Sequence, residues 1–198
     1  MSTDGKGQRA AALLRPECNA GRSQGLSRVR FIVHEKFMCK AVIKQAYSAS
    51  DYATGKLLIE EYAAALGVDL CFQNFAEEIA NLPGLYGPPR GCLLVARRNE
   101  ELAGCVAVRG LDKGDCEIKR LYVRPKYRRE GVGRRLVETA IGFARDVGYA
   151  RMLLDTLPAM TEAQSLYQSL GFGEIDGYYR NPVEGVRYLA LELGGDET

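Results

Sequence analysis

The segment from Cys116 to Arg135 combines residue types that bind phosphate groups. A strand with alternating polar and apolar residues leads through Pro125 into a loop that contains Gly131 and Gly133, and a helix follows. Glycines let the main chain approach a ligand closely, and a helix N-terminus favours anions. Four arginines near the loop add positive charge: Arg128, Arg129, Arg134 and Arg135. The pattern predicts a phosphate or pyrophosphate site, and a solvated helix start with surface arginines is the alternative.

Two common phosphate-binding motifs do not explain this segment. A P-loop requires GxxxxGK followed by Ser or Thr, and the segment lacks this pattern. A dinucleotide-binding fold requires GxGxxG in a first strand–helix–strand unit, and neither condition is met. The expected ligand is therefore another compound that carries a pyrophosphate.

The charges of the chain are unevenly distributed. Residues 1–40 hold eight Lys and Arg against three Asp and Glu, whereas the remaining residues hold 19 against 22. This mildly acidic remainder argues against a general nucleic-acid binder. Within it, residues 119–135 carry eight basic side chains and one acid, Glu130, so the positive charge is concentrated at the predicted phosphate site.

The cysteines indicate neither a metal site nor a disulfide framework. The six cysteines include no CxxC pair, and the chain has one histidine, His34. No metal is therefore expected, and reduced cysteines favour a cytoplasmic location. No apolar run reaches the roughly 20 residues that a membrane-spanning helix needs.

The chain is expected to hold one domain at residues 38–198, preceded by an extension at residues 1–37. The extension is rich in Gly, Arg, Ser and Gln without sustained apolar periodicity, so it is predicted to be disordered. A transit peptide, or a true start at Met38, is the alternative.

Apolar periodicity divides the domain into strands and helices. The expected strands cover residues 41–47, 92–97, 102–109, 116–123, 152–155, 173–179 and 186–193. The expected helices run from an N-cap at Asp51 to Gly67, and over about 72–81, 133–146 and 161–170, with a loop over 83–91. This order predicts an α/β (α+β) fold with a mixed sheet and helices on both faces.

Two motifs resemble those of the GNAT superfamily of N-acetyltransferases. Residues 128–133 match Q/R-x-x-G-x-G/A, and Ala163, Leu166–Tyr167 and Gly171–Phe172 resemble A-x-x-L-Y-x-x-x-G-F. The element order agrees over roughly residues 40–193, and the sequence resembles a bacterial subgroup whose acceptor is unsettled. The resemblance implies the GNAT acyl-CoA N-acyltransferase fold, a mostly antiparallel, splayed sheet of about seven strands with four helices on both faces.

The resemblance also implies acetyl-CoA as the co-substrate. Main-chain N–H groups of residues 129–134 would hold its pyrophosphate, and the edge of the strand ending at Val123 would pair with the pantetheine arm. The implied CoA-binding residues are Leu121, Tyr122, Val123, Arg128, Arg129, Glu130, Gly131, Val132, Gly133 and Arg134. Relatives often carry Asn where Met160 stands, so that contact is not expected here. Glu130 must point away from the pyrophosphate or weaken its binding.

Acetyl transfer to an amine needs a base, a donor to the oxyanion and an acid for the thiolate. Glu117 stands where many relatives keep the base, acting directly or through water. Its alternative role is an ion pair with Lys119 or Arg120. Tyr167 matches the family tyrosine that protonates the thiolate, although it also belongs to the buried stripe of its helix. The main-chain N–H of Leu121 is the expected oxyanion donor.

The acceptor site is less defined by the sequence. In the family, the first two helices and the last hairpin cover it, which points to Tyr62, Phe72, Phe75, Tyr178, Tyr179 and Asn181. Their rings could hold a cationic amine or serve only packing. The expected function is acetyl transfer to a primary amine of a small molecule or peptide by direct attack in a ternary complex. A non-catalytic acyl-CoA-binding regulatory module and a nucleic-acid binder are the alternatives. No nucleic-acid or membrane partner is expected, and a homodimer is allowed.

Overall fold

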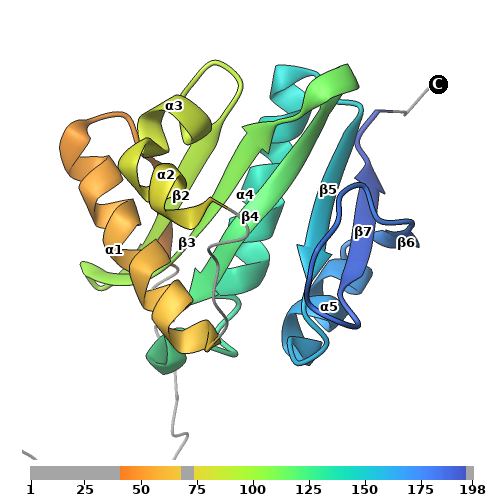
Figure 1. The fold of residues 1–198 in the computed structure, drawn as a ribbon. Helices are drawn as coiled ribbons and strands as arrows, with labels where there is room; N and C mark the ends of the chain where they lie inside the picture. Colours follow the sequence, from red (N-terminus) through yellow and green to blue (C-terminus); the bar gives the residue numbers. More distant parts are fainter. Residues whose placement is uncertain (1–40, 68–73, 195–198) are drawn as a thin grey trace, which may run out of the picture. The chain divides into compact units, whose positions relative to one another are not determined.

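The computed structural model describes residues 41–67 and 74–194, which form a seven-stranded sheet in the order β1-β2-β3-β4-β5-β7-β6 (Figure 1). The strands are β1 Val42–Gln45, β2 Cys92–Arg98, β3 Glu101–Gly110, β4 Asp115–Val123, β5 Arg151–Thr156, β6 Gly173–Ile175 and β7 Arg187–Glu192. The helices are α1 Ala49–Leu66, α2 Phe75–Ala80, α3 Leu82–Tyr86, α4 Val132–Val147 and α5 Thr161–Ser169. Neighbouring strands are antiparallel except β4 and β5, which are parallel. The predicted mixed, mostly antiparallel sheet is confirmed, and the expected boundary at residues 37 and 38 lies outside the described residues.

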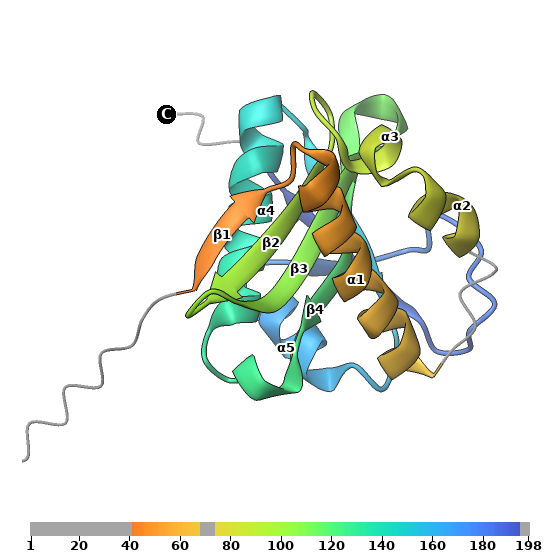
Figure 2. The same cartoon turned by 90° about the vertical axis from the view of Figure 1, so that its left-hand side faces the viewer.

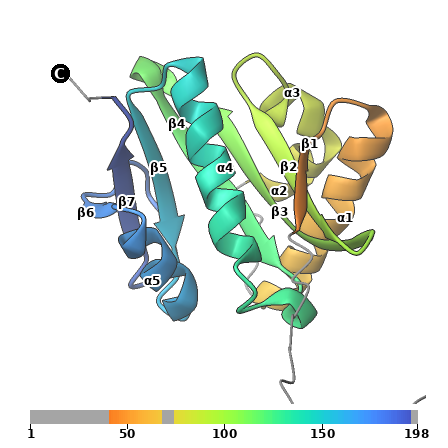
Figure 3. The same cartoon turned by 180° about the vertical axis from the view of Figure 1, so that it is seen from behind.

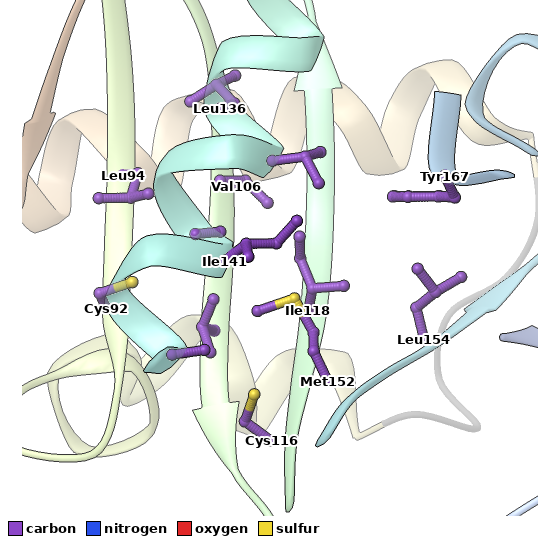
Figure 4. Packing of buried hydrophobic residues seen from close by; sticks show 14 of the residues in the cluster. Cys92, Leu94, Val106, Cys116, Ile118, Leu136, Ile141, Met152, Leu154 and Tyr167 are labelled. Carbon is purple, nitrogen blue, oxygen red and sulfur yellow. The ribbon is translucent and has the colours of Figure 1, made fainter. Parts of the chain in front are cut away.

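Helices cover both faces of the sheet. α1, α2 and α3 lie on one face (Figure 2), and α4 and α5 lie on the other (Figure 3). α4 buries residues at helical spacing, and Figure 4 shows Leu136 and Ile141 packed over Leu94 and Ile118 of the sheet. A second apolar core lies under α1 and α3 and includes Leu58. The two cores fix the sheet between its helical layers.

The start of α1 differs from the expectation. Ser48, and not Asp51, is the N-cap, and its hydroxyl accepts a hydrogen bond from the Asp51 N–H at 3.2 Å. The Asp51 carboxylate in turn accepts a hydrogen bond from the Ser48 N–H at 2.9 Å. The two residues therefore form a capping box with Asp51 at its third helical position. The end of α1 follows the prediction, since Gly67 adopts φ +65°.

The expected helix at 72–81 and the loop after it are also corrected. Only Phe75–Ala80 is helical in the described part, and a separate short helix, α3, occupies Leu82–Tyr86 within the predicted loop. Pro83 fits the first turn of α3, where its missing N–H costs nothing, and the Asn81 side chain accepts the Gly84 N–H at 3.2 Å. The described chain thus has five α-helices in place of the four expected.

The sheet opens between β4 and β5. The two strands pair only over Asp115–Glu117 and Arg151–Leu153, and the pairing ends there. The remaining part of β4, from Ile118 to Val123, keeps β3 as its only strand neighbour in the described sheet. One edge of β4 is therefore free to pair with a ligand, as the splayed sheet of the resemblance implies.

Candidate active site

A β-bulge in β4 changes which face its side chains occupy. The pairing with β3 shifts register between Cys105 and Ala107, and Arg120 has a positive φ of 58°. Ile118 belongs to the core under α4, whereas Tyr122 belongs to the core under α1. Residues four apart in a regular strand would share a face. The bulge thus lets one strand serve two different sites on either side of Arg120.

The first site is a cleft of about 960 Å³ along the C-terminal part of β4 and the start of α4. Its lining includes Leu121, Tyr122, Val123, Arg128, Arg129, Gly131, Gly133 and Arg134. Residues of α1 and the α5 region complete it, among them Tyr62 and Met160. All predicted CoA-binding residues line this cleft except Glu130 and Val132. Val132 is buried in the core, and the Glu130 carboxylate forms an ion pair with Arg98 of β2.

The start of α4 fits an anionic ligand. Gly131 is the N-cap with φ +78°, and in the described chain no side chain caps the first turn, which also contains no acid. A Cβ added at Gly131 would meet no atom within 4 Å, so the space before the helix is open. The first N–H groups of a helix lack internal partners and carry the positive end of its dipole. These donors fit the pyrophosphate of CoA.

The arginines at this cleft differ in how strongly their side chains are fixed by contacts within the protein. Arg128 donates from Nε to the Val123 carbonyl at 3.1 Å, so its position is set by the main chain. Arg129 is highly exposed and faces Glu162 at 3.3 Å, and Arg134 donates to the Ser169 hydroxyl at 2.7 Å. Exposed pairs of this kind stabilise a protein little, so Arg129 can turn to a phosphate at small cost.

Glu117 is the last residue of β4 that pairs with β5. It is buried, with 1% of its surface exposed. Arg109 of β3 donates from Nε to Oε2 at 2.7 Å, and its Nη2 lies 2.7 Å from the same oxygen as an ion pair. The Tyr178 hydroxyl donates to Oε1 at 2.8 Å, and Lys119 Nζ lies 3.5 Å from the same oxygen. The alternative of an ion pair therefore applies to Arg109 and Lys119, while Arg120 bonds Glu78 instead.

The second site is a cavity of about 860 Å³ on the α2–α3 side of the sheet, and Glu117, Tyr178 and Tyr179 line it. Carboxylates outnumber cations in its wall: Glu77, Glu78, Asp112, Asp115 and Glu117 against Arg109, Lys119 and Arg151. Asn181 lies behind the wall and donates to the Tyr179 hydroxyl at 3.1 Å and to Asp155 at 3.2 Å. Arg120 offsets the charge of Glu78, which leaves four carboxylates against three cations, and this remaining excess of negative charge favours a cationic acceptor.

The other predicted acceptor residues lie elsewhere. Tyr62 lines the CoA cleft, where burial raises its pKa to about 12. The Phe75 ring packs on the Arg120 guanidinium, with 5.3 Å from Cζ to the ring centroid. Phe72 lies outside the described residues.

Tyr167 is buried on α5, where its ring packs against Phe172 with centroids 5.5 Å apart. Figure 4 shows it at the margin of the core, on the side of Leu154. It lines neither of the two cavities described above, and its hydroxyl has no hydrogen-bond partner within the described chain. Burial raises its pKa, with further contributions from Tyr62 and Asp155. The side chain is therefore protonated at neutral pH.

Sequence reasoning named Lys119 as a possible partner of the candidate base but missed Arg109 and Tyr178 in that role. Arg109 stands at the end of the apolar run of β3, Cys105–Val108, and Tyr178 lies 61 residues beyond Glu117. A charged residue next to a buried strand was the available signal for Arg109. Tyr178 was predicted for the acceptor site, but nothing local in the sequence indicated its bond to Glu117, which it makes from the segment between β6 and β7.

A sheet that opens beside an uncapped helix start, with a buried carboxylate at the opening, is the arrangement of an acyl-CoA-dependent transferase. The sequence profile described as the acetyltransferase (GNAT) family matches residues 57–172. The chain is 46% identical over 140 residues to an uncharacterized N-acetyltransferase of Schizosaccharomyces pombe, covering 70% of this chain and 86% of that protein. The chain therefore belongs to the GNAT acetyltransferase family, as the resemblance implied, and it is an acetyl-CoA-dependent N-acetyltransferase.

Solved structures share the fold at lower identity. A GNAT-family acetyltransferase from Staphylococcus aureus Mu50 superposes with a TM-score of 0.66 at 19% identity, covering 78% of this chain and all of that chain. A putative acetyltransferase from Salmonella typhimurium, solved with acetyl-CoA, superposes at 0.57 and 22% identity, covering 80% and 96%. None of the described helices is both long and apolar enough to span a bilayer.

Proposed function

We propose that the chain transfers the acetyl group of acetyl-CoA to a primary amine by direct attack in a ternary complex. The observation that carries the proposal is that residues of β4 line both cavities. Glu117 faces the acidic cavity, and Leu121–Val123 line the cleft that ends at the uncapped start of α4. Acetyl-CoA supplies an activated thioester, and the opening of the sheet after Glu117 leaves an edge beside which it can lie. An amine in the acidic cavity can then approach along the same strand.

In this proposal Glu117 is the general base. An ionised carboxylate has about four acceptor positions. Hydrogen bonds from Arg109 Nε and the Tyr178 hydroxyl use one position on Oε2 and one on Oε1. A position that remains can take a proton from the amine directly or through one water molecule. The two cations beside Glu117 hold the carboxylate in place for this step.

Tyr167 is proposed as the acid that protonates the leaving thiolate. Its raised pKa keeps the proton on the hydroxyl until the transfer. The main-chain N–H of Leu121 is proposed as the donor to the carbonyl oxygen on which negative charge develops. Glu117, Leu121 and Tyr167 then supply the base, the donor and the acid.

The acceptor is proposed to be a cationic amine on a small molecule or a peptide. The excess of carboxylates in the cavity and the rings of Tyr178 and Tyr179 support this choice. The proposal places the reaction in the cytoplasm, because Cys92, Cys105 and Cys116 are free thiols. It includes a homodimer as one assembly, and no nucleic-acid or membrane partner.

A mass-resolved screen of amines with acetyl-CoA tests the proposal, and release of free thiol together with an acetylated amine is the expected result. CoA binding without turnover across small amines, peptides and lysine side chains would contradict the proposal that the protein is an enzyme. That result would favour the regulatory acyl-CoA-binding module instead.

A further inference from the structure

A buried ion pair joins α2 to the bulge of β4. Glu78 and Arg120 are 3% and 5% exposed, and the guanidinium donates from Nε to Oε1 at 2.8 Å and from Nη2 to Oε2 at 2.5 Å. The Tyr86 hydroxyl donates to Oε1 at 2.7 Å, and the Phe75 ring lies against the guanidinium. Burial opposes ionisation of Glu78, yet Arg120 and Tyr86 bring its net pKa below the ordinary value. Both partners are therefore charged and fixed.

Stability alone does not explain this pair. Removing two charges from water costs several kcal/mol per ion, and well-packed apolar residues of similar volume are often as stable. Tyr86, which bonds Glu78, belongs to the apolar core under α1 and α3, and Glu78 also lines the acidic cavity. What a bidentate pair supplies and an apolar pair does not is a fixed orientation of the residues that carry it.

Arg120 is the residue whose orientation matters most in β4. It is the bulge residue with φ +58°, an unfavourable value for a side chain with a Cβ. Its carbonyl oxygen accepts a contact from the Cys105 thiol of β3 at 3.5 Å. In a trans peptide the C=O and the following N–H point in opposite directions. Because the Arg120 C=O points toward β3, the Leu121 N–H points away from β3, toward the opening between β4 and β5.

We infer that Glu78 is a positioning residue for acetyl transfer, acting through Arg120. The pair holds the bulge so that the peptide between Arg120 and Leu121 presents its N–H to the thioester carbonyl oxygen. The inference rests on the proposed function, in which Leu121 is that donor. A displacement of this donor by about 1 Å would slow the reaction up to about 100-fold without changing CoA binding.

The decisive variant replaces both charges, Glu78→Met with Arg120→Met. It leaves no unpaired buried charge, but the buried Tyr86 hydroxyl loses its acceptor, so the variant is expected to fold with a lowered melting temperature. The matched control is Glu61→Met with Arg124→Met. This second bidentate pair joins α1 to the residue after β4, with Nε–Oε2 and Nη2–Oε1 distances of 2.9 and 2.6 Å, and it does not touch the bulge. If the first variant does not fold, Tyr86→Phe removes one bond to Glu78 and serves as the second variant.

The expected result is a kcat lowered about 10- to 100-fold by the Glu78/Arg120 variant, with the Kd for CoA unchanged in calorimetry. The control is expected to keep kcat within about threefold, because neither Glu61 nor Arg124 bonds Glu78 or Arg120 and the two pairs are therefore separate. With Tyr86→Phe the expected loss is smaller but again confined to kcat. If conditions that restore the melting temperature of the Glu78/Arg120 variant also restore its kcat, the inference is overturned, because the pair would then be only structural. Equal losses of kcat in both double variants would overturn it as well.

A second readout separates this inference from the proposed function. In ¹⁵N-labelled wild-type protein, the Leu121 amide resonance is expected to differ between the acetyl-CoA and CoA complexes, and the difference is expected to vanish in the Glu78/Arg120 variant. If no amine is ever acetylated, the proposed function fails, and loss of this shift difference still supports the part of the inference in which the Glu78–Arg120 pair orients the Leu121 N–H. Retention of the full difference in the variant overturns it.

Discussion

Replacing Glu117 by Gln should separate the chemical role of this residue from its structural role. Arg109 makes one charge-assisted hydrogen bond and one further ion-pair contact to the carboxylate, and such a hydrogen bond contributes about 1.5–3 kcal/mol. A neutral amide keeps part of this, and Arg109 is about a third exposed, so we expect a loss of roughly 2 kcal/mol in unfolding free energy. For a domain of this size that lowers the melting temperature by about 4–8 °C. The protein should therefore remain folded at 25 °C.

The effect on the rate should be far larger than this loss of stability. Removing a general base lowers kcat by about 10²–10⁴-fold. The assay follows thiol release from acetyl-CoA with the best amine from the screen, and calorimetry should give an unchanged Kd for CoA. The matched control is Glu61→Gln, which weakens the bidentate pair with Arg124 on another helix and should change kcat less than about threefold. A Glu117→Gln enzyme with kcat within about fivefold of the wild type would refute Glu117 as the base.

Three further predictions concern other residues. Tyr167→Phe removes a hydroxyl without a hydrogen-bond partner in the described chain, so stability should change by less than about 1 kcal/mol while kcat falls at least about 10-fold; an unchanged kcat would contradict its role as the acid. Gly131→Ala should cost about 1 kcal/mol, because φ is +78°, and should weaken CoA binding in calorimetry. Gly148→Ala, with φ +86° at the other end of α4, should cost as much stability and leave the Kd unchanged, and equal Kd values for both variants would argue against the anion site. Burial raises the pKa of Tyr62 to about 12, so the unfolded state loses this proton first; denaturant titrations should show an unfolding free energy constant below about pH 10 and falling between pH 10 and 12, and a flat profile would contradict this.

The parts of the site that sequence alone predicted are those set by local chemistry. The start of α4 could be placed because Gly131 and Gly133 follow a strand and precede an apolar stripe, and each of these signals is local. Gly67 and Gly148 marked helix ends in the sequence because glycine is the usual residue at a helix C-terminus. Both adopt the positive φ that this position requires. Part of the cleft beside β4 follows from these elements, because much of its lining comes from the single stretch Leu121–Arg134, whereas its lining from α1 and the α5 region depends on the fold.

The parts that sequence did not predict depend on distant contacts. Glu78 and Arg120 lie 42 residues apart, and the bulge at Arg120 involves no glycine that would mark it in the sequence. Ser48 and Asp51 are both good N-cap residues, so only the reciprocal bonds of the capping box decide between them. The second residue of α3 is Pro83. In the sequence alone a proline at this point indicates a loop, because its position in the first turn of a helix is not known.

The central claim is that the cleft between β4 and the start of α4 binds CoA. A crystal structure of the protein grown with saturating CoA tests it most directly. The account predicts diphosphate density at about 3 Å from the main-chain N–H groups of residues 129–134, with the pantetheine arm beside Leu121 and Val123. CoA density at any other place, with this cleft holding only solvent, would contradict the account.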